Sequence, residues 1–253
     1  MTLRNIFGSL SLVAGLLFVQ PVFAKTAAAP LQTITPANFD QILSETDAEF
    51  QALVGKYSLK KLEQLDHIKN TAVTHLSADE VHARDEYKKL LERKVDLDFM
   101  RGLRDALVKQ YQDNAPSPDY DRKALHDEST LLSVGLIHEI ARLKEKYHSF
   151  FMPVVHNMMI SVGMRKRGAC KHWAEDLLTF MLPIDRKFFY LNWGEAHPGK
   201  VGEHNVAVLI PKGTPFEKGL FIDPWRTSGK PFWLKIPDDK HYHWKRWEGW
   251  DGL

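Results

Sequence analysis

Residues 167–178 read RGACKHWAEDLL and contain Cys170, the only cysteine of the 253-residue chain. Gly168 lies two positions before this cysteine, and apolar residues follow it at helical spacing: Trp173, Ala174, Leu177 and Leu178. The spacing predicts a helix that begins at Cys170 and buries those four side chains. A thiol at a helix N-terminus lies near oriented backbone N–H groups, which favour the thiolate, the nucleophilic form.

Two polar residues downstream lie at the ends of apolar runs. His204 precedes residues 205–210 (NVAVLI), and Asp223 follows residues 219–222 (GLFI). Both runs are expected to be strands, because they are short, apolar and separated by glycine and proline. Adjacent antiparallel strands bring the side chains at their ends together. We therefore expect a catalytic triad in which Asp223 orients His204 and His204 takes the proton of the Cys170 thiol, as acyl transfer requires.

The composition of the chain changes after Phe150. All seven tryptophans lie between Trp173 and Trp250, and residues 187–193 and 231–236 are two further strand candidates. The sequence therefore predicts an α+β protein whose core, residues 151–253, has a small antiparallel sheet packed on the cysteine-bearing helix.

Residues 35–150 are expected to form a mostly helical region. Ser77 and Glu80 have the spacing of a capping box, which opens a long charged amphipathic helix to about Gln112. The turn formers at 113–119 should end it, and a second helix is expected at about 125–147. We expect this region to form one wall of the substrate groove or a partner-docking face.

The N-terminus has the pattern of a secretory signal. Residues 6–19 are uncharged and rich in leucine, and Val22-Phe23-Ala24 is suited to cleavage after Ala24. Residues 1–24 are therefore expected to be a signal peptide and residues 25–34 a flexible leader, which predicts a periplasmic or secreted protein with no integral membrane span after signal removal. A retained N-terminal anchor helix is the alternative.

Charge and composition exclude several classes of protein. The chain has 34 Lys and Arg residues against 32 Asp and Glu residues, a net charge of +2, so nucleic acid is not an expected partner. Hydrophobic residues make up 44%, which is typical of a globular protein and excludes a collagen-like or low-complexity chain. One cysteine excludes a disulfide scaffold, so packing must hold the fold together.

The three motifs, taken in order, resemble those of the transglutaminase-like cysteine peptidase superfamily, within the wider papain-like fold. The similar residues are Gly168-Ala169-Cys170 with Trp173-Ala174, then His204 at a strand start, then Ile222-Asp223-Pro224 at a strand end. The resemblance covers about residues 152–236. It implies a cofactor-free peptidase or amidase that acts on a peptide, protein or cell-wall peptide through a thioester, with hydrolysis favoured over cross-linking.

The chain departs from this superfamily in one respect. Many transglutaminase relatives have an oxyanion-hole tryptophan upstream of the cysteine, and papain relatives have a glutamine. This chain has no tryptophan before Trp173 and no glutamine between Gln112 and Cys170. The second oxyanion donor is therefore unassigned. Asn157, Trp173 and Trp225 are the candidates for oxyanion or substrate contact.

Two other interpretations stay open. The chain can be a non-catalytic envelope module that binds peptide or glycan on a papain-like fold, with Trp247 and Trp250 as surface contacts. It can also be a structural zinc protein that uses Cys170 and His172, although a single Cys-x-His pair is a weak metal signal and no metal is the preferred expectation. The oligomeric state does not follow from the sequence.

Overall fold

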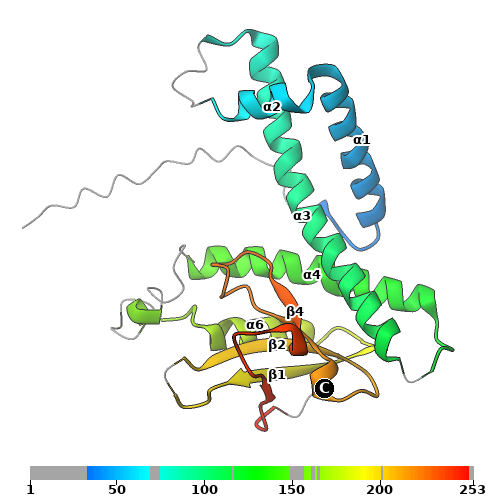
Figure 1. Cartoon of the computed structure of the whole chain (residues 1–253), viewed down its shortest axis with the longest axis vertical. Helices are drawn as coiled ribbons and strands as arrows, with labels where there is room; N and C mark the ends of the chain where they lie inside the picture. Colours follow the sequence, from blue (N-terminus) through cyan, green and yellow to red (C-terminus); the bar gives the residue numbers. More distant parts are fainter. Residues whose placement is uncertain are drawn as a thin grey trace, which may run out of the picture.

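The computed structural model describes residues 33–68, 75–115, 117–148, 157–160, 163, 166–200 and 202–250. Within these residues the protein is α+β, as predicted, with helices first and a five-stranded antiparallel sheet last (Figure 1). The predicted signal peptide, residues 1–24, and all but the last two residues of the predicted leader, 25–34, lie outside the described residues.

The described helices are α1 (Phe39–Tyr57), α2 (Leu59–Asp66), α3 (Ala78–Asn114), α4 (Arg122–Tyr147) and α6 (Cys170–Met181). The longest helix, α3, begins at the cap that the sequence predicts, and α4 begins three residues before its expected start. The capping box is confirmed, since Ser77 Oγ accepts the N–H of Glu80 and the Glu80 carboxylate accepts the N–H of Ser77. Asp121 caps α4 by accepting the N–H of Ala124. In the described part of the chain, no helix has the length and apolarity of a membrane span.

The sheet has the order β4-β3-β2-β1-β5. Its strands are β1 (Phe189–Ala196), β2 (His204–Pro211), β3 (Leu220–Ile222), β4 (Trp233–Lys235) and β5 (Lys245–Arg246). The first four were predicted to within two or three residues at each end. β5 was not, because two exposed charged residues carry no strand pattern.

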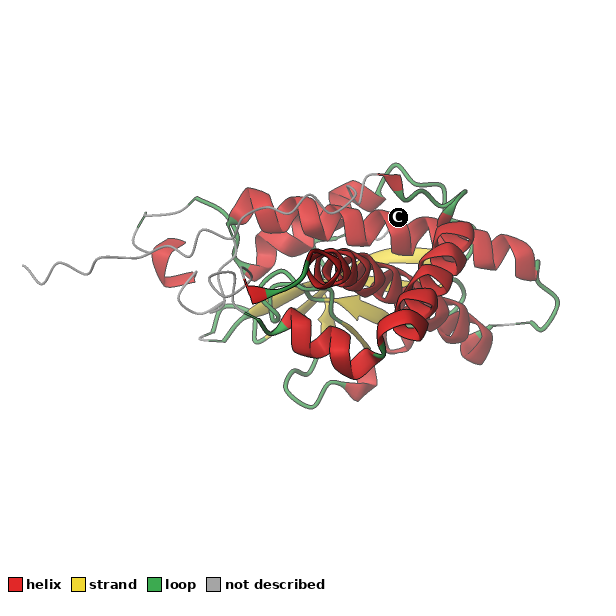
Figure 2. Ribbon diagram, turned by 90° about the horizontal axis from the view of Figure 1, so that it is seen from above, coloured by secondary structure: helices red, strands yellow, loops and turns green. Residues whose placement is uncertain are grey.

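The central strand β2 is buried along its whole length. Alternate side chains of a strand point to opposite faces, and here Ala207 and Leu209 join the core beneath α6, whereas Val206 and Val208 join a cluster on the other face. Seen from above, the helices lie in front of the strands (Figure 2). The prediction that the sheet packs on the cysteine-bearing helix is therefore confirmed.

One core spans both halves of the chain. Residues from the second half of α3, such as Leu103, and from α4, such as Leu136, share it with residues of α6 and the sheet. A separate small cluster joins α1, α2 and the start of α3 around Leu62, Leu65 and Tyr87, and these elements extend away from the sheet (Figure 1). The predicted boundary at residue 150 thus does not separate two cores.

Candidate active site

His204 and Asp223 lie side by side, as the strand order requires. β2 and β3 pair antiparallel with Ala207 opposite Ile222, a register that continues to Val206 opposite Asp223. His204 lies two residues further along β2, on the same face as Val206. His204 Nε2 and Asp223 Oδ2 are 2.7 Å apart, and both side chains are 1% exposed. The carboxylate therefore fixes the orientation of the imidazole.

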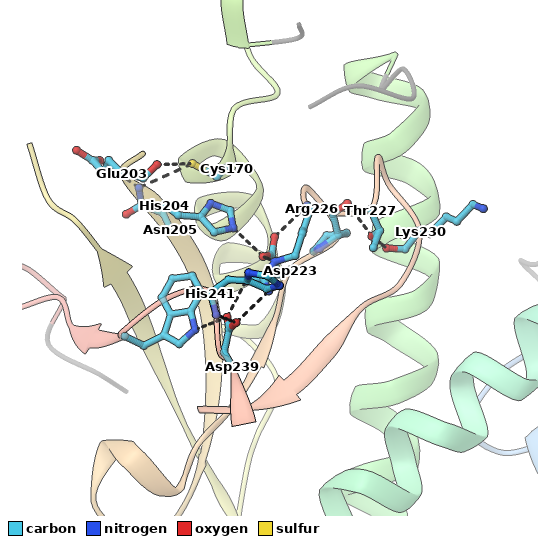
Figure 3. Close-up of polar contacts among 12 residues, drawn as sticks. Cys170, Glu203, His204, Asn205, Asp223, Arg226, Thr227, Lys230, Asp239 and His241 are labelled. Atoms are coloured by element: carbon cyan, nitrogen blue, oxygen red, sulfur yellow. Dashed lines mark hydrogen bonds and ion pairs between the residues drawn. The ribbon is translucent and has the colours of Figure 1, made fainter. Parts of the chain in front are cut away.

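The His204 ring lies between Asp223 and the Cys170 sulfur (Figure 3). Its Nδ1 makes no hydrogen bond within the described residues, yet Cys170 is close enough to affect its protonation. Burial opposes a charge on the ring, but the hydrogen bond that the ring donates to Asp223, the thiol of Cys170 and the charge of both raise the pKa of His204 to about 9. A protonated imidazole beside the sulfur favours the thiolate.

Local backbone geometry places Cys170 at the first position of α6. Gly168 has a φ of 116°, a conformation that side chains with a Cβ rarely adopt. His172 Nδ1 accepts the N–H groups of Gly168 and Ala169 at 3.0 and 3.1 Å, so this histidine caps the helix. Burial, Arg167 and Lys171 lower the pKa of His172, which keeps that nitrogen free to accept.

The cap also argues against the zinc interpretation. His172 Nδ1 uses its lone pair for two backbone N–H groups, and that lone pair is what a metal would need. Throughout the described ranges, no group of three or more His, Cys, Asp or Glu side chains could hold a metal ion.

Ion pairs fasten the segment before Cys170 to two helices. Arg167 Nη2 lies 2.7 Å from Glu175 and 2.8 Å from Asp176 on α6. The hydroxyl of Tyr147, the last residue of α4, donates to Asp176 at 2.6 Å. The basic run before the cysteine therefore has a structural role at Arg167.

A buried charge network continues beyond Asp223, and the sequence analysis missed it. Arg226 Nε donates to Asp223 Oδ2 at 2.9 Å, and Arg226 Nη2 lies 2.8 Å from Asp239. Trp244 Nε1 donates to the same Asp239 carboxylate at 2.9 Å. In the sequence, only the i, i+3 spacing of Asp223 and Arg226 hints at this network.

Asn205 approaches the thiol from the α6 face of β2. Its Nδ2 lies 4.0 Å from Cys170 Sγ and 3.2 Å from a carboxylate oxygen of Glu203, and its Oδ1 accepts Trp193 Nε1 at 2.8 Å. The sequence analysis assigned Asn205 no role, because it appears there as one residue of an apolar strand. Only the packing of α6 on β2 brings it to the sulfur.

The other predicted site residues lie in different surroundings. Asn157 falls in the short segment 157–160, and no hydrogen bond between described residues joins it to Cys170. Trp173 is 2% exposed and packs edge-on against Tyr147, so it belongs to the core and does not reach substrate. Trp225 is half-buried with its ring 4.8 Å from the His204 ring, which it shields.

Two open pockets lie beside the triad. One, of about 470 Å³, contains Lys171, Trp193, Asn205 and Trp247 in its wall. The other, of about 530 Å³, is lined by His197, Gly202, Arg226, His241 and Tyr242. All the described residues that line these two pockets come from position 167 onward. The helical region contributes no described residue to these two walls, and its role as a groove wall or a partner-docking face stays a prediction.

Comparison with protein-family models, curated proteins and solved structures finds no match for this chain. The resemblance to transglutaminase-like peptidases therefore stays a prediction from three motifs. The function has to be argued from the geometry of the site.

Proposed function

We propose that the protein is a cysteine hydrolase that cleaves amide bonds through a thioester on Cys170. One observation carries the proposal: a buried histidine bound at 2.7 Å to a buried carboxylate, with its other ring nitrogen toward the only thiol. A thiol nucleophile, a base and a group that orients the base are the parts that nucleophilic acyl transfer needs.

The reaction follows from this arrangement. His204 takes the thiol proton, and the thiolate adds to the amide carbonyl: a C–S bond forms and the π electrons move to oxygen. The adduct collapses when the C–N bond breaks, and His204 gives its proton to the amine that leaves. Water then adds to the thioester, His204 takes a proton from it, and the C–S bond breaks to restore the thiolate. Asp223 stabilises the imidazolium throughout.

The proposed substrate is a peptide, protein or cell-wall peptide that the protein meets outside the cytoplasm. Hydrolysis is favoured over transfer to an amine, because water needs no second binding site. The two pockets near the triad, one lined in part by Asn205 and the other by Arg226, support access by a substrate.

The test is the reactivity of Cys170. In the wild-type protein, iodoacetamide should alkylate Cys170 near pH 7 at least tenfold faster than in His204→Ala, because the imidazolium favours the thiolate. The wild type should also cleave members of a library of peptide aminomethylcoumarin amides, and Cys170→Ala should cleave none. Equal alkylation of wild type and His204→Ala would contradict the proposal.

The non-catalytic binding module is the second candidate. Cys170 is only 5% exposed, and Trp193 and Trp247, with ring centroids 4.9 Å apart, line the neighbouring pocket as a glycan or peptide platform would. This candidate predicts that iodoacetamide does not alkylate Cys170 in the wild type or in His204→Ala. It would be supported if the protein bound peptidoglycan fragments without cleaving them and Cys170→Ala bound them equally well.

A further inference from the structure

The thiolate mechanism needs a second donor to the oxyanion, and the surroundings of Cys170 contain one. We propose that Asn205 is a catalytic residue whose Nδ2 group binds the oxyanion together with the backbone N–H of Cys170. Trp193 is then the positioning residue that holds the amide in the required orientation. The assignment rests on the proposed function, because an oxyanion forms only when the thiolate adds to a carbonyl.

The distance fits the role. Asn205 Nδ2 lies 4.0 Å from Cys170 Sγ. In the tetrahedral adduct the oxygen is two bonds from the sulfur, so an adduct that presents its oxygen on the Asn205 side brings it closer to this donor than the sulfur is. A donor at this distance from sulfur can therefore reach the separation of about 3 Å that an oxyanion donor needs.

Two neighbours fix which end of the amide faces the sulfur. The Trp193 indole N–H can only donate, so the atom 2.8 Å from it must be the amide oxygen. The Glu203 carboxylate can only accept while it is ionised, so the atom 3.2 Å from it must be the amide nitrogen. The N–H of Gly199 and the Asn205 amide lower the pKa of Glu203, which keeps it ionised. A flipped amide would lose both hydrogen bonds.

The two catalytic side chains approach the thiol from opposite faces of β2. His204 and Asn205 are consecutive residues of one strand, so their side chains point to different faces. The proton donor for the leaving group is thereby separated from the donor to the oxyanion. The Cys170 N–H, at the first helical position, has no intrahelical acceptor. Asn205 and Trp193 both line the pocket of about 470 Å³, through which a carbonyl can enter.

The experiment compares two reactions of Cys170 in the full protein. Acylation by p-nitrophenyl acetate passes through an oxyanion, whereas alkylation by iodoacetamide displaces iodide without one. Asn205→Ala should slow acylation by roughly 100-fold and leave alkylation within about twofold of the wild type. Trp193→Phe keeps the ring but loses the N–H donor, so it should slow acylation by about tenfold, with no further loss when combined with Asn205→Ala.

Trp233→Phe is the matched control for the tryptophan change. Its ring packs edge-on against Phe99, with 6.2 Å between centroids, and is not among the described residues that line the pocket, so both rates should stay at the wild-type value. If Asn205→Ala slowed acylation and alkylation equally, or was acylated at the normal rate, the assignment of Asn205 would be wrong, while the proposed function would stand. A wild-type thiol that iodoacetamide alkylates but the ester does not acylate would overturn the proposed function, and the assignment with it.

Discussion

At the scale of single residues, the site is a chain of charges that alternates in sign. The His204 imidazolium contacts the Asp223 carboxylate, Asp223 contacts Arg226, and Arg226 contacts Asp239. Each buried charge thus has a partner of opposite sign, which offsets the cost of removing it from water. The protonation of His204 should therefore respond to a change anywhere along the chain.

The raised pKa of His204 predicts a loss of stability in alkali. The unperturbed pKa is about 6.5 and the folded pKa about 9, so this contribution is fully present below pH 6.5 and lost as the pH rises through 9. The free energy of unfolding should fall by on the order of 3 kcal/mol across that window. Urea unfolding of wild type and His204→Gln between pH 6 and 10 measures this loss of stability. If both proteins lost stability equally as the pH rose, His204 would not be its cause.

Asp239 should affect His204 through Arg226. Asp239→Asn leaves the positive charge of Arg226 without its nearest counter-ion, which disfavours a second positive charge on the imidazole. We expect the alkaline limb of kcat/KM for an amide substrate to move down by about one pH unit. Asp238→Asn is the control, because that neighbouring side chain is exposed and makes no contact with Arg226 among the described residues. The same shift in both variants would exclude the network as the cause.

At the scale of elements, polar contacts at element ends determine where the site residues lie. His172 holds the start of α6, and Glu128 on α4 accepts the N–H groups of Lys187, Phe188 and Phe189 ahead of and at the start of β1. This carboxylate satisfies backbone groups that lie outside the strand ladder. It also explains why β1 begins at Phe189, two residues after the predicted start.

The His172 cap predicts an acid-sensitive helix start. The folded pKa of His172 is lowered, so its contribution to stability is present above the unperturbed pKa of about 6.5 and is lost as the pH falls below that value through the folded pKa. His172→Ala should cost about 1 kcal/mol at pH 7, as loss of a cap does, and the cost should shrink toward pH 5. Urea unfolding at both pH values tests this, with Thr179→Ala on the same helix as control. An equal loss of stability in His172→Ala at pH 7 and at pH 5 would contradict the capping role of His172.

Glu128 should be among the more costly carboxylates to remove. Glu128→Ala leaves three backbone N–H groups without their acceptor, which should lower the free energy of unfolding by about 3 kcal/mol. Glu145→Ala, an exposed position on the same helix, should cost less than about 0.5 kcal/mol. Chemical denaturation compares the two variants. Equal losses of stability would show that Glu128 does not stabilise the start of β1.

At the scale of the whole molecule, the site belongs to the larger of two packed regions. The core beneath the sheet supports α6 and β2, whereas the α1–α2 cluster packs only against the start of α3. α2 lies beside the end of α3 that is far from α6 and β2 (Figure 1). A destabilising substitution in the α1–α2 cluster should therefore leave the reactivity of Cys170 unchanged.

Two leucine variants test this independence. Leu65→Ala, in the α1–α2 cluster, should reduce hydrogen-exchange protection of α1 and α2 while the rate of Cys170 alkylation stays unchanged. Leu107→Ala, in the shared core, should cost 2–5 kcal/mol globally, on the order seen for such truncations, and reduce protection in α4 and the sheet as well. Slower alkylation in Leu65→Ala would show that the two regions are coupled.

The sequence alone determined the features that depend on local physics. Helical periodicity and caps located α3, α4 and the start of α6, and apolar runs between turn residues located β1 to β4. Because consecutive strands joined by a short connection usually pair with each other, the approach of His204 to Asp223 was predictable as well. Such features need only neighbours in the chain or in the adjacent strand.

Tertiary structure alone determined the features that depend on which faces of the helices and strands pack together. Asn205 reaches the sulfur because α6 packs on that side of β2, and Arg226 and Asp239 meet because the chain after β4 folds back onto the turn after β3. Contacts between residues far apart in sequence depend on packing in three dimensions, which no local pattern of residues encodes.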